Sequence, residues 1–340
     1  MSQNSCCCTS SACCGTPAIQ TVSTQLTLKD KLGGWKVRWG LARMDYTMEP
    51  GIYAAGEPNE TSPVLVSANY KLTFDTLRKH LTGLHCWLLI LDTKGVNVWC
   101  AAGKGTFGTD ELVHRIQETG LADVVAHKKL ILPQLGAPGV SAHEVTKRTG
   151  FSVTYGPVRA DDIQAFISSG YKATKQMRTV RFTMWDRLVL TPMELVIAAK
   201  TSLMLFGVLF LINLFAARPF GLFDFVVYAA AVLTGAFVTP VLLPYIPGKA
   251  FALKGWLLGM IGTGLIAWAY GWFAPPSLLL GIGYMLSLPP CSAYLAMNFT
   301  GASTYTSPSG VLKEMKIALP LIVLSLVAGI ILLLIKTFVG

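Results

Sequence analysis

The second half of the sequence contains five long apolar segments, at approximately residues 195–215, 225–246, 255–274, 277–297 and 317–338. An α-helix needs about 20 apolar residues to cross the hydrocarbon core of a bilayer. Across the whole chain, 52% of residues are hydrophobic and only 14% are charged, which is unlike an ordinary soluble protein. The sequence therefore predicts a transmembrane domain with five helices over residues 191–340.

Basic residues beside these segments predict how the chain is oriented. The positive charges lie before the first segment, between the second and third, and before the fifth: Arg178, Arg181, Arg187, Lys249, Lys254, Lys313 and Lys316. Because cytoplasmic loops are enriched in Lys and Arg, we expect a multi-pass protein of the cytoplasmic membrane. The N-terminal domain is then in the cytoplasm and the C-terminus outside. The net charge of +10 forms no long basic patch, so nucleic-acid binding is not expected.

Residues 28–190 alternate short apolar runs with amphipathic stretches. The runs at 64–66, 86–91, 129–132 and 152–155 predict strands, and the stretches between them have helical spacing. Such alternation is typical of an α/β fold with a Rossmann-like, largely parallel sheet. We also expect residues 28–63 to be irregular, with a turn at Gly33-Gly34-Trp35. Gly120 and Gly150 are expected to end helices, the second of which begins with a capping box at 141–144. Residues 180–190 are expected to form a last strand.

The first 27 residues are expected to be a disordered, Cys-rich tail. Five of the eight cysteines in the chain lie there, at Cys6, Cys7, Cys8, Cys13 and Cys14. A disulfide framework would spread its cysteines through the fold, so this pattern indicates a reducing compartment. The cluster is either a site for a soft metal ion or simply a variable tail.

Residues 97–105 carry the motif most suggestive of chemistry. They read Asn-Val-Trp-Cys-Ala-Ala-Gly-Lys-Gly and follow an apolar run. We expect residues 96–100 to be extended. Small residues after Cys100 predict a bare surface beside a thiolate, which suits a large flat ligand such as a corrin or haem whose metal takes an axial sulfur.

Two nucleotide sites compete for the same stretch. A phosphate loop is rejected, because Val98 stands where its first glycine belongs and Gly105 where Ser or Thr belongs. A dinucleotide fingerprint, G-x-G-x-x-G, does fit residues 103–108, with Asp123 near the expected offset. However, Asp123 precedes a strand instead of ending one. The remaining cysteines, Cys86 and Cys291, read as small buried hydrophobes.

The eight residues at 97–104 resemble the signature of a family, the membrane-anchored corrinoid protein of the bacterial and archaeal mercury-methylation pair. Its corrinoid domain is similar to that of the corrinoid iron–sulfur protein of acetyl-CoA metabolism. The resemblance implies a corrinoid cofactor of the cobalamin type, carried as methylcob(III)alamin, and methyl transfer to Hg(II) to give methylmercury. It also implies that Cys100 is the catalytic residue and the lower axial ligand of cobalt.

The same resemblance implies how the methyl group moves and which partners are needed. A thiolate ligand favours departure of the methyl group as a carbanion equivalent, and radical transfer remains open. A small ferredoxin with two 4Fe–4S clusters is the implied reductant. A methyl-folate-dependent protein is the implied methyl donor.

The motif and the other strand ends give the candidate binding residues. In the motif, Asn97 is expected to fix the loop or bond the corrin edge, Trp99 to pack beneath the ring, and Lys104 to reach a polar group of the ligand. Ala101, Ala102 and Gly103 are expected to permit close approach. The complete set is Ser67, Asn69, Thr73, Val96, Asn97, Val98, Trp99, Cys100, Ala101, Ala102, Gly103, Lys104, Gly136, Ala137 and Tyr155.

Three other functions stay open at this point. The chain is a membrane-bound corrinoid methyl carrier for a carbon substrate, a dinucleotide-binding membrane regulator, or a mercury-binding membrane protein without enzymatic activity. Charged groups are sparse inside the apolar segments, so transport is not favoured.

Overall fold

The computed structural model describes residues 19–215, 220–275 and 277–338. The N-terminal cysteine cluster lies outside these residues. The chain divides into two compact units, which are described separately. The α/β unit contains Met44–Thr179 and the residues up to Gly33, and the helical unit contains Gly34–Arg43 and the residues from Val180 onward.

A six-stranded sheet forms the centre of the α/β unit, in the order β1-β2-β4-β3-β5-β6. The strands are β1 (Gln20–Val22), β2 (Gly51–Ala55), β3 (Val64–Ala68), β4 (Cys86–Leu91), β5 (Lys129–Leu132) and β6 (Ser152–Tyr155). Only the β2–β4 pair is antiparallel. The predicted largely parallel α/β sheet is therefore confirmed.

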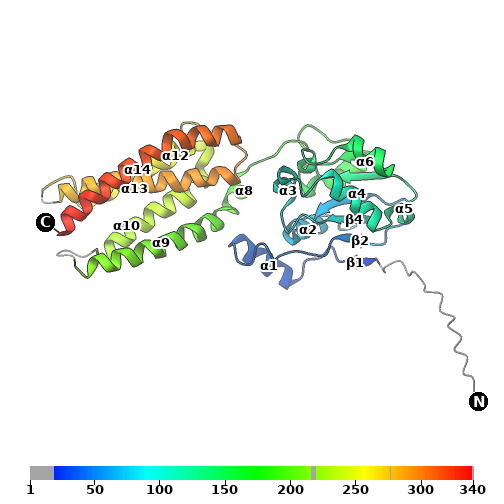
Figure 1. Ribbon diagram of the computed structural model, residues 1–340, viewed down its shortest axis with the longest axis horizontal. Helices are drawn as coiled ribbons and strands as arrows, with labels where there is room; N and C mark the ends of the chain where they lie inside the picture. Colours follow the sequence, from blue (N-terminus) through cyan, green and yellow to red (C-terminus); the bar gives the residue numbers. More distant parts are fainter. Residues whose placement is uncertain (1–18, 216–219, 276, 339–340) are drawn as a thin grey trace, which may run out of the picture. The chain divides into compact units, whose positions relative to one another are not determined.

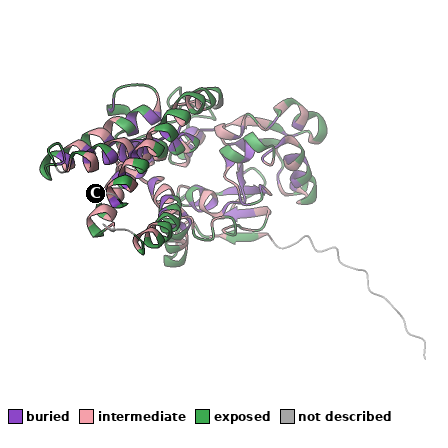
Figure 2. Cartoon of the chain, turned by 60° about the vertical axis from the view of Figure 1, so that its left-hand side comes forward, coloured by how far each residue is buried: buried purple, intermediate pink, exposed green. Residues whose placement is uncertain are grey.

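Helix α1 (Leu28–Arg38) follows β1, and other helices cover both faces of the sheet (Figure 1). They are α2 (Lys71–Arg78), α3 (Val98–Lys104), α4 (Thr109–Glu118), α5 (Leu121–Val124), the 3-10 turn η1 (Gln134–Gly136), α6 (Ala142–Thr149), the 3-10 turn η2 (Ala160–Asp162) and α7 (Ile163–Ser168). On one face, Leu91 packs in a core with Leu112 of α4. On the other, Ile90 packs with Phe74 of α2 and Phe166 of α7. The central strands are buried on both faces (Figure 2).

Several expectations for the flanking segments are wrong. Within the expected disordered tail, β1 pairs in parallel with β2. Residues 28–63 contain α1 and β2 and are not irregular. Gly33 and Gly34 do not turn the chain. They lie inside α1, where Gly34 is buried and Gly33 leaves room for the ring of Tyr46.

The expected strand at 180–190 is also wrong. Residues Met184–Leu188 form helix α8, because Thr183 and Asp186 make a capping box at its start. In contrast, the capping box expected at Ser141 is not formed, and the Ser141 amide donates to Thr109 Oγ1 at 2.8 Å. Helix α6 still ends at Gly150, which has a left-handed conformation, as the glycine predicts.

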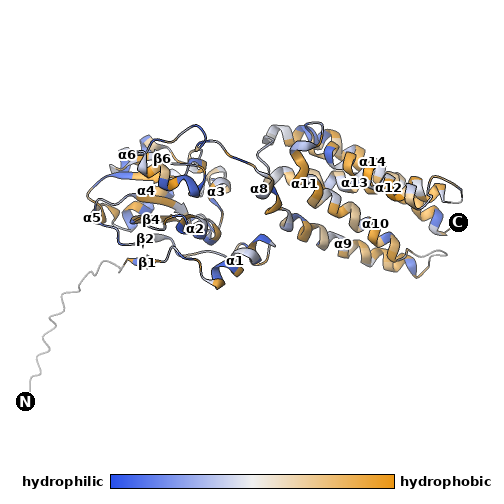
Figure 3. Cartoon of the chain, turned by 180° about the vertical axis from the view of Figure 1, so that it is seen from behind, coloured by the Kyte–Doolittle hydropathy of each residue, from blue (hydrophilic) through white to orange (hydrophobic). Residues whose placement is uncertain are grey.

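The helical unit contains five helices long and apolar enough to cross a membrane, which cover Met184–Asn213, Leu222–Tyr245, Phe251–Ala269, Leu278–Ala302 and Ser309–Phe338. Their main helical elements are α9 (Thr191–Asn213), α10 (Leu222–Leu233), the π-helix η3 (Thr234–Val238), α11 (Thr239–Leu242), η4 (Leu243–Tyr245), α12 (Phe251–Ala269), α13 (Leu278–Asn298), η5 (Phe299–Ala302) and α14 (Pro308–Phe338). In Figure 3 these helices are coloured mostly as hydrophobic residues. The five predicted apolar helices are confirmed by length and composition.

A charged cluster joins α1 to α2 within the α/β unit. Lys71 Nζ lies 2.6 Å from Asp30 Oδ1 and 2.8 Å from Asp75 Oδ2, and Arg78 Nη2 lies 2.8 Å from Asp30 Oδ2. Burial alone would raise the pKa of Asp30. Hydrogen bonds from Lys71, Thr27 and Arg78 outweigh burial and hold that pKa well below its usual value.

This depressed pKa predicts acid-sensitive attachment of α1. A carboxyl with a lowered folded-state pKa adds stability above its unfolded pKa, near 3.9, and loses it as the pH falls toward the folded value. We expect Asp30→Asn to lower the free energy of unfolding of the α/β unit by about 1–2 kcal/mol at pH 7. The difference from wild type should shrink as the pH falls from about 5 to about 3. Denaturant unfolding at several pH values checks this, and a constant difference would contradict it.

Candidate functional site

Helix α3 carries the motif and follows the carboxyl end of β4. The expected extended run at 96–100 is wrong, since helix α3 begins at Val98. Asn97 is its N-cap, and the Asn97 Oδ1 atom accepts a hydrogen bond from the Cys100 amide at 2.9 Å. An Asn side chain that satisfies an amide of the first turn stabilises a helix start. The motif thus places Cys100 in the first turn of a short helix.

The two sides of α3 have different surroundings. Val98, Ala101 and Ala102 are buried in the core against the sheet. Trp99, which is 43% exposed, and Cys100 point to the surface. The expectation that the two alanines form bare surface is therefore wrong, because helical spacing turns both into the core.

Glycines supply the open surface instead. A Cβ atom added to Gly103 or Gly105 would meet no atom within 4 Å. Gly103 is three residues after Cys100, so both lie on one side of the helix, followed by exposed Lys104. Next to them, Thr106 Oγ1 is buried without a hydrogen-bond partner, the sole such side-chain atom among residues 19–338 where the structure describes them. An open thiol, a flat glycine surface and an orphaned hydroxyl fit a large flat ligand.

Asn69 fixes the loop between β4 and α3. Its Oδ1 accepts hydrogen bonds from the Thr93 amide at 3.1 Å, Thr93 Oγ1 at 2.9 Å and the Gly95 amide at 3.1 Å. Thr93 Oγ1 also lies 2.7 Å from the Val96 carbonyl oxygen, so its single proton is shared between these two acceptors. Asn69 is buried, so its role in this structure is to position the loop that leads to Cys100. Thr93 is a residue of this network that the sequence reasoning missed.

The loop after β5 packs against α3 and brings in three more predicted residues. Gly136 lies in η1, which contacts α3, and Ala137 follows it. Tyr155, at the end of β6, donates from its hydroxyl to the Val140 carbonyl at 2.7 Å. Gly139 was missed, although a Cβ there would come within 3.0 Å of Ala102 Cα and 2.2 Å of the Phe107 carbonyl oxygen. The run Gly-Ala-Pro-Gly at 136–139 could have indicated this close backbone contact.

Two predicted residues lie on the other face of the sheet. Ser67 shares its side of β3 with Leu65, which belongs to the core beneath α2. Thr73 lies in α2 itself. The structure therefore gathers the motif, Asn69, Gly136, Ala137 and Tyr155 around α3, and separates Ser67 and Thr73 from them.

Cys86, His85 and His127 have side chains that could bind a metal, but they do not lie near the exposed side of α3. Cys86 is 0% exposed, and burial raises the pKa of its thiol to about 12. His85 Nδ1 accepts from the Glu57 amide at 2.8 Å, and His127 Nε2 lies 2.8 Å from the Ser62 carbonyl. Both histidines precede strands, so they lie at the amino ends of the strands, whereas Cys100 follows the carboxyl end of β4. Within the described ranges, no group of three or more His, Cys, Asp or Glu side chains is arranged to hold a metal ion.

The structure around Gly103–Gly108 does not match that of a dinucleotide-binding site. That fingerprint requires a strand, a tight glycine turn and then a helix. Here α3 stands between β4 and the glycines, and Gly105 ends α3 in a left-handed conformation. Asp123 lies in α5, not at a strand end.

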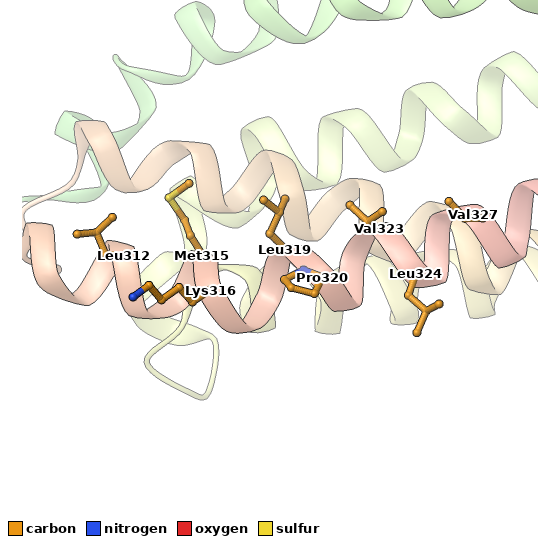
Figure 4. Close-up of a pocket in the computed structure, with 8 residues that line it drawn as sticks. All are labelled: Leu312, Met315, Lys316, Leu319, Pro320, Val323, Leu324 and Val327. Carbon is orange, nitrogen blue, oxygen red and sulfur yellow. The ribbon is translucent and has the colours of Figure 1, made fainter.

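The helical unit has a groove of its own. It has a volume of about 770 Å³ and follows the apolar side of α14, with Lys316 as its charged residue (Figure 4). Its lining comes from one helix and includes no nucleophile. It is the kind of surface that a membrane-spanning helix presents to acyl chains.

Removal of the Asn97 cap should loosen α3. We expect Asn97→Ala to lower the free energy of unfolding by about 1 kcal/mol, with Asn97→Ser restoring most of it, because serine also caps helices well. Denaturant unfolding of the three proteins checks this. Equal losses for alanine and serine would show that the cap is not what matters.

Comparison with known proteins addresses the same part of the chain. Residues 42–167 match the family described as CO dehydrogenase/acetyl-CoA synthase delta subunit. The α/β unit resembles that subunit family. The matched range includes α3 and its loop network and ends within α7.

Curated relatives agree with this match. The gamma subunit of the acetyl-CoA decarbonylase/synthase complex of Methanocaldococcus jannaschii is 32% identical over 131 residues, which is 38% of this chain and 26% of that protein. The same subunit of Methanopyrus kandleri is 34% identical over 122 residues, 35% of this chain and 26% of the relative. That of Archaeoglobus fulgidus is 31% identical over 131 residues, 38% and 27% respectively. The chain thus spans about a quarter of the length of these relatives.

Proposed function

We propose that the α/β unit binds a corrinoid over the exposed side of α3, and that the chain transfers its methyl group to Hg(II). The observation that carries this proposal is the exposed Cys100 beside the open surface of Gly103 and Gly105. The similarity to acetyl-CoA decarbonylase/synthase subunits supports it, because the motif at 97–104 also resembles corrinoid proteins related to that metabolism.

The residues around α3 fit a macrocycle better than a free metal ion. A single thiol gives only one soft ligand, so a metal held here would need its other ligands from a macrocycle. Cys100 would hold the metal from one side, with Trp99 and Lys104 on the same exposed surface. Asn97 accepts a hydrogen bond from the Cys100 amide, and Asn69 holds the loop that precedes α3.

A bound methylcorrinoid supplies a cobalt-held methyl group that a soft electrophile such as Hg(II) can accept. Cys100 would be the ligand of this surface that donates electron density to the bound metal, and such donation would favour transfer of the methyl group to an electrophile. Val98, Ala101 and Ala102 pack the other side of α3 into the core and so hold the helix with Cys100 outward.

The proposal extends to partners and location. The five apolar helices are compatible with anchoring in the cytoplasmic membrane, with the α/β unit on the cytoplasmic side as the basic residues predict. A ferredoxin with two 4Fe–4S clusters is the proposed reductant, and a methyl-folate-dependent protein the proposed methyl donor.

A second candidate is a membrane-bound methyl carrier for a carbon substrate. The relatives favour it, since their complex is named for acetyl-CoA chemistry. It uses the same site on α3 and differs only in the acceptor.

The decisive experiment compares acceptors. The purified full chain is reconstituted with methylcobalamin, and its absorption spectrum is followed while Hg(II) or a carbon acceptor is added. The proposal expects methylmercury to form while the methyl–cobalt bands disappear. Methyl transfer to the carbon acceptor without methylmercury would establish the second candidate instead.

A further inference from the structure

Helix α1 has an apolar stripe that faces away from the protein. Leu28, Leu32 and Trp35 are 72%, 59% and 66% exposed. Trp39, just past the end of the helix, extends the stripe, with its ring centroid 6.0 Å from that of Trp35. The spacing of 4 and 3 residues between Leu28, Leu32 and Trp35, which follows from the residue numbers, places these three side chains along one line of the helix. A soluble protein rarely leaves such a stripe without a partner.

Basic residues border this stripe on both sides. At 100° per residue, Lys36 and Lys29 lie on one side of it and Lys31 on the other. All three lysines are exposed. An apolar line with flanking lysines is the pattern of helices that lie in the headgroup region of a bilayer, where the stripe enters the acyl boundary and the lysines meet anionic lipid.

The opposite side of α1 is held by the protein. Val37 is buried, and Asp30 is bound by Lys71 and Arg78 of α2. Thr27 and Asp30 also bond each other at the helix start, with the Asp30 amide donating to Thr27 Oγ1 at 3.2 Å and the Thr27 amide donating to Asp30 Oδ2 at 3.0 Å. The helix is therefore fixed with its stripe outward.

The C-terminal part of α1 belongs to the unit of the apolar helices. Gly34–Arg43 belong to the same compact unit as the apolar helices. Within that unit, a Cβ on Gly40 would lie 2.9 Å from the Met193 sulfur, in the first turn of α9. Trp185 of α8, just before α9, is also exposed, and Trp is enriched at membrane interfaces. If α9 crosses a membrane, as its length and composition predict, the lipid surface lies near the residue at which α1 ends.

We propose that α1 is an interfacial membrane helix that binds the anionic phospholipid surface at which α9 begins. Leu28, Leu32 and Trp35 enter the headgroup region, and the flanking lysines bind lipid phosphates. The lipid surface is favoured over a protein partner by the lysines beside the stripe and by its continuity with the start of a span. The inference does not depend on the corrinoid or on mercury.

The test places a photo-crosslinker on the stripe of the full chain. Leu32 or Trp35 is replaced by benzoylphenylalanine, and each protein is reconstituted in nanodiscs of phosphatidylcholine with a minority of phosphatidylglycerol. After irradiation, mass spectrometry identifies what is joined to the α1 peptide. The matched control carries the same group at exposed Lys147 on α6.

We expect lipid adducts at positions 32 and 35 and few at 147. Lys29→Gln, Lys31→Gln and Lys36→Gln together should lower the phosphatidylglycerol adduct by about fivefold or more. Adducts at 32 and 35 no more abundant than at 147, or adducts joined to another protein chain, would overturn the proposal. An unchanged phosphatidylglycerol adduct in the triple variant would overturn the assignment to anionic lipid.

Discussion

Replacement of Cys100 by alanine is expected to lower methylmercury formation by more than about 100-fold, since even residues that only support a metal ligand cost about 10–100-fold. The side chain is exposed, so the free energy of unfolding should change by no more than about 0.5 kcal/mol. Two measurements check this: the rate with Hg(II), and the absorption spectrum of the reconstituted protein. The spectrum should lose the shift that a sulfur ligand gives to cobalt.

Cys86→Ala is the matched control for this prediction. The Cys86 thiol is buried within β4 and cannot reach the surface of α3. Its loss should cost about 1 kcal/mol of stability through lost packing and leave both the spectrum and the rate unchanged. If Cys100→Ala binds corrinoid with the same spectrum as wild type, sulfur ligation by Cys100 is wrong, and only the comparison of acceptors then decides between Hg(II) and a carbon substrate.

Asn69→Ala is expected to have the largest effect on stability, about 3 kcal/mol in the free energy of unfolding. The substitution removes the acceptor for two amides and one hydroxyl. A buried donor that loses its partner costs about 1–3 kcal/mol. Hydrogen exchange of residues 92–104 should accelerate as well, because the loop that leads into α3 loses its fixed point.

Asn97→Ala is the variant with which Asn69→Ala is compared, because it removes a single hydrogen bond at the other end of the same loop. Denaturant unfolding should rank Asn69→Ala well below Asn97→Ala. A loss for Asn69→Ala equal to or smaller than that for Asn97→Ala would show that water replaces the missing acceptor and that Asn69 does not hold the loop.

The sequence predicted the sheet and the apolar helices well because their signals are strong. Strand β4 is six consecutive apolar residues, Cys86–Leu91, which only a strand buried on both faces explains at that length. Each apolar helix carries enough hydrophobic residues to be predicted from the sequence alone. Gly120 and Gly150 gave the ends of α4 and α6 to within two residues.

The failures share a cause. Helix α3 is seven residues long, too short for periodicity to reveal, and its start depends on the side chain of Asn97. Once α3 is helical, Ala101 and Ala102 turn inward, and the open surface moves to Gly103. Helix α1 was missed because Gly33 and Gly34 read as a turn. Its partners, Lys71 and Arg78, lie far away in the sequence and can be known only from the fold.

The anchoring of α3 has a consequence for the thermodynamics of ligand binding. Asn69 and Asn97 fix the loop and the first turn through the protein's own hydrogen bonds, so the thiol is preorganised before any ligand arrives. Ligand binding then orders few additional backbone torsions, and little of the binding free energy is lost as conformational entropy. Titration calorimetry should show a heat-capacity change that reflects burial of the ligand and the Trp99 surface alone, without the larger change that accompanies coupled folding.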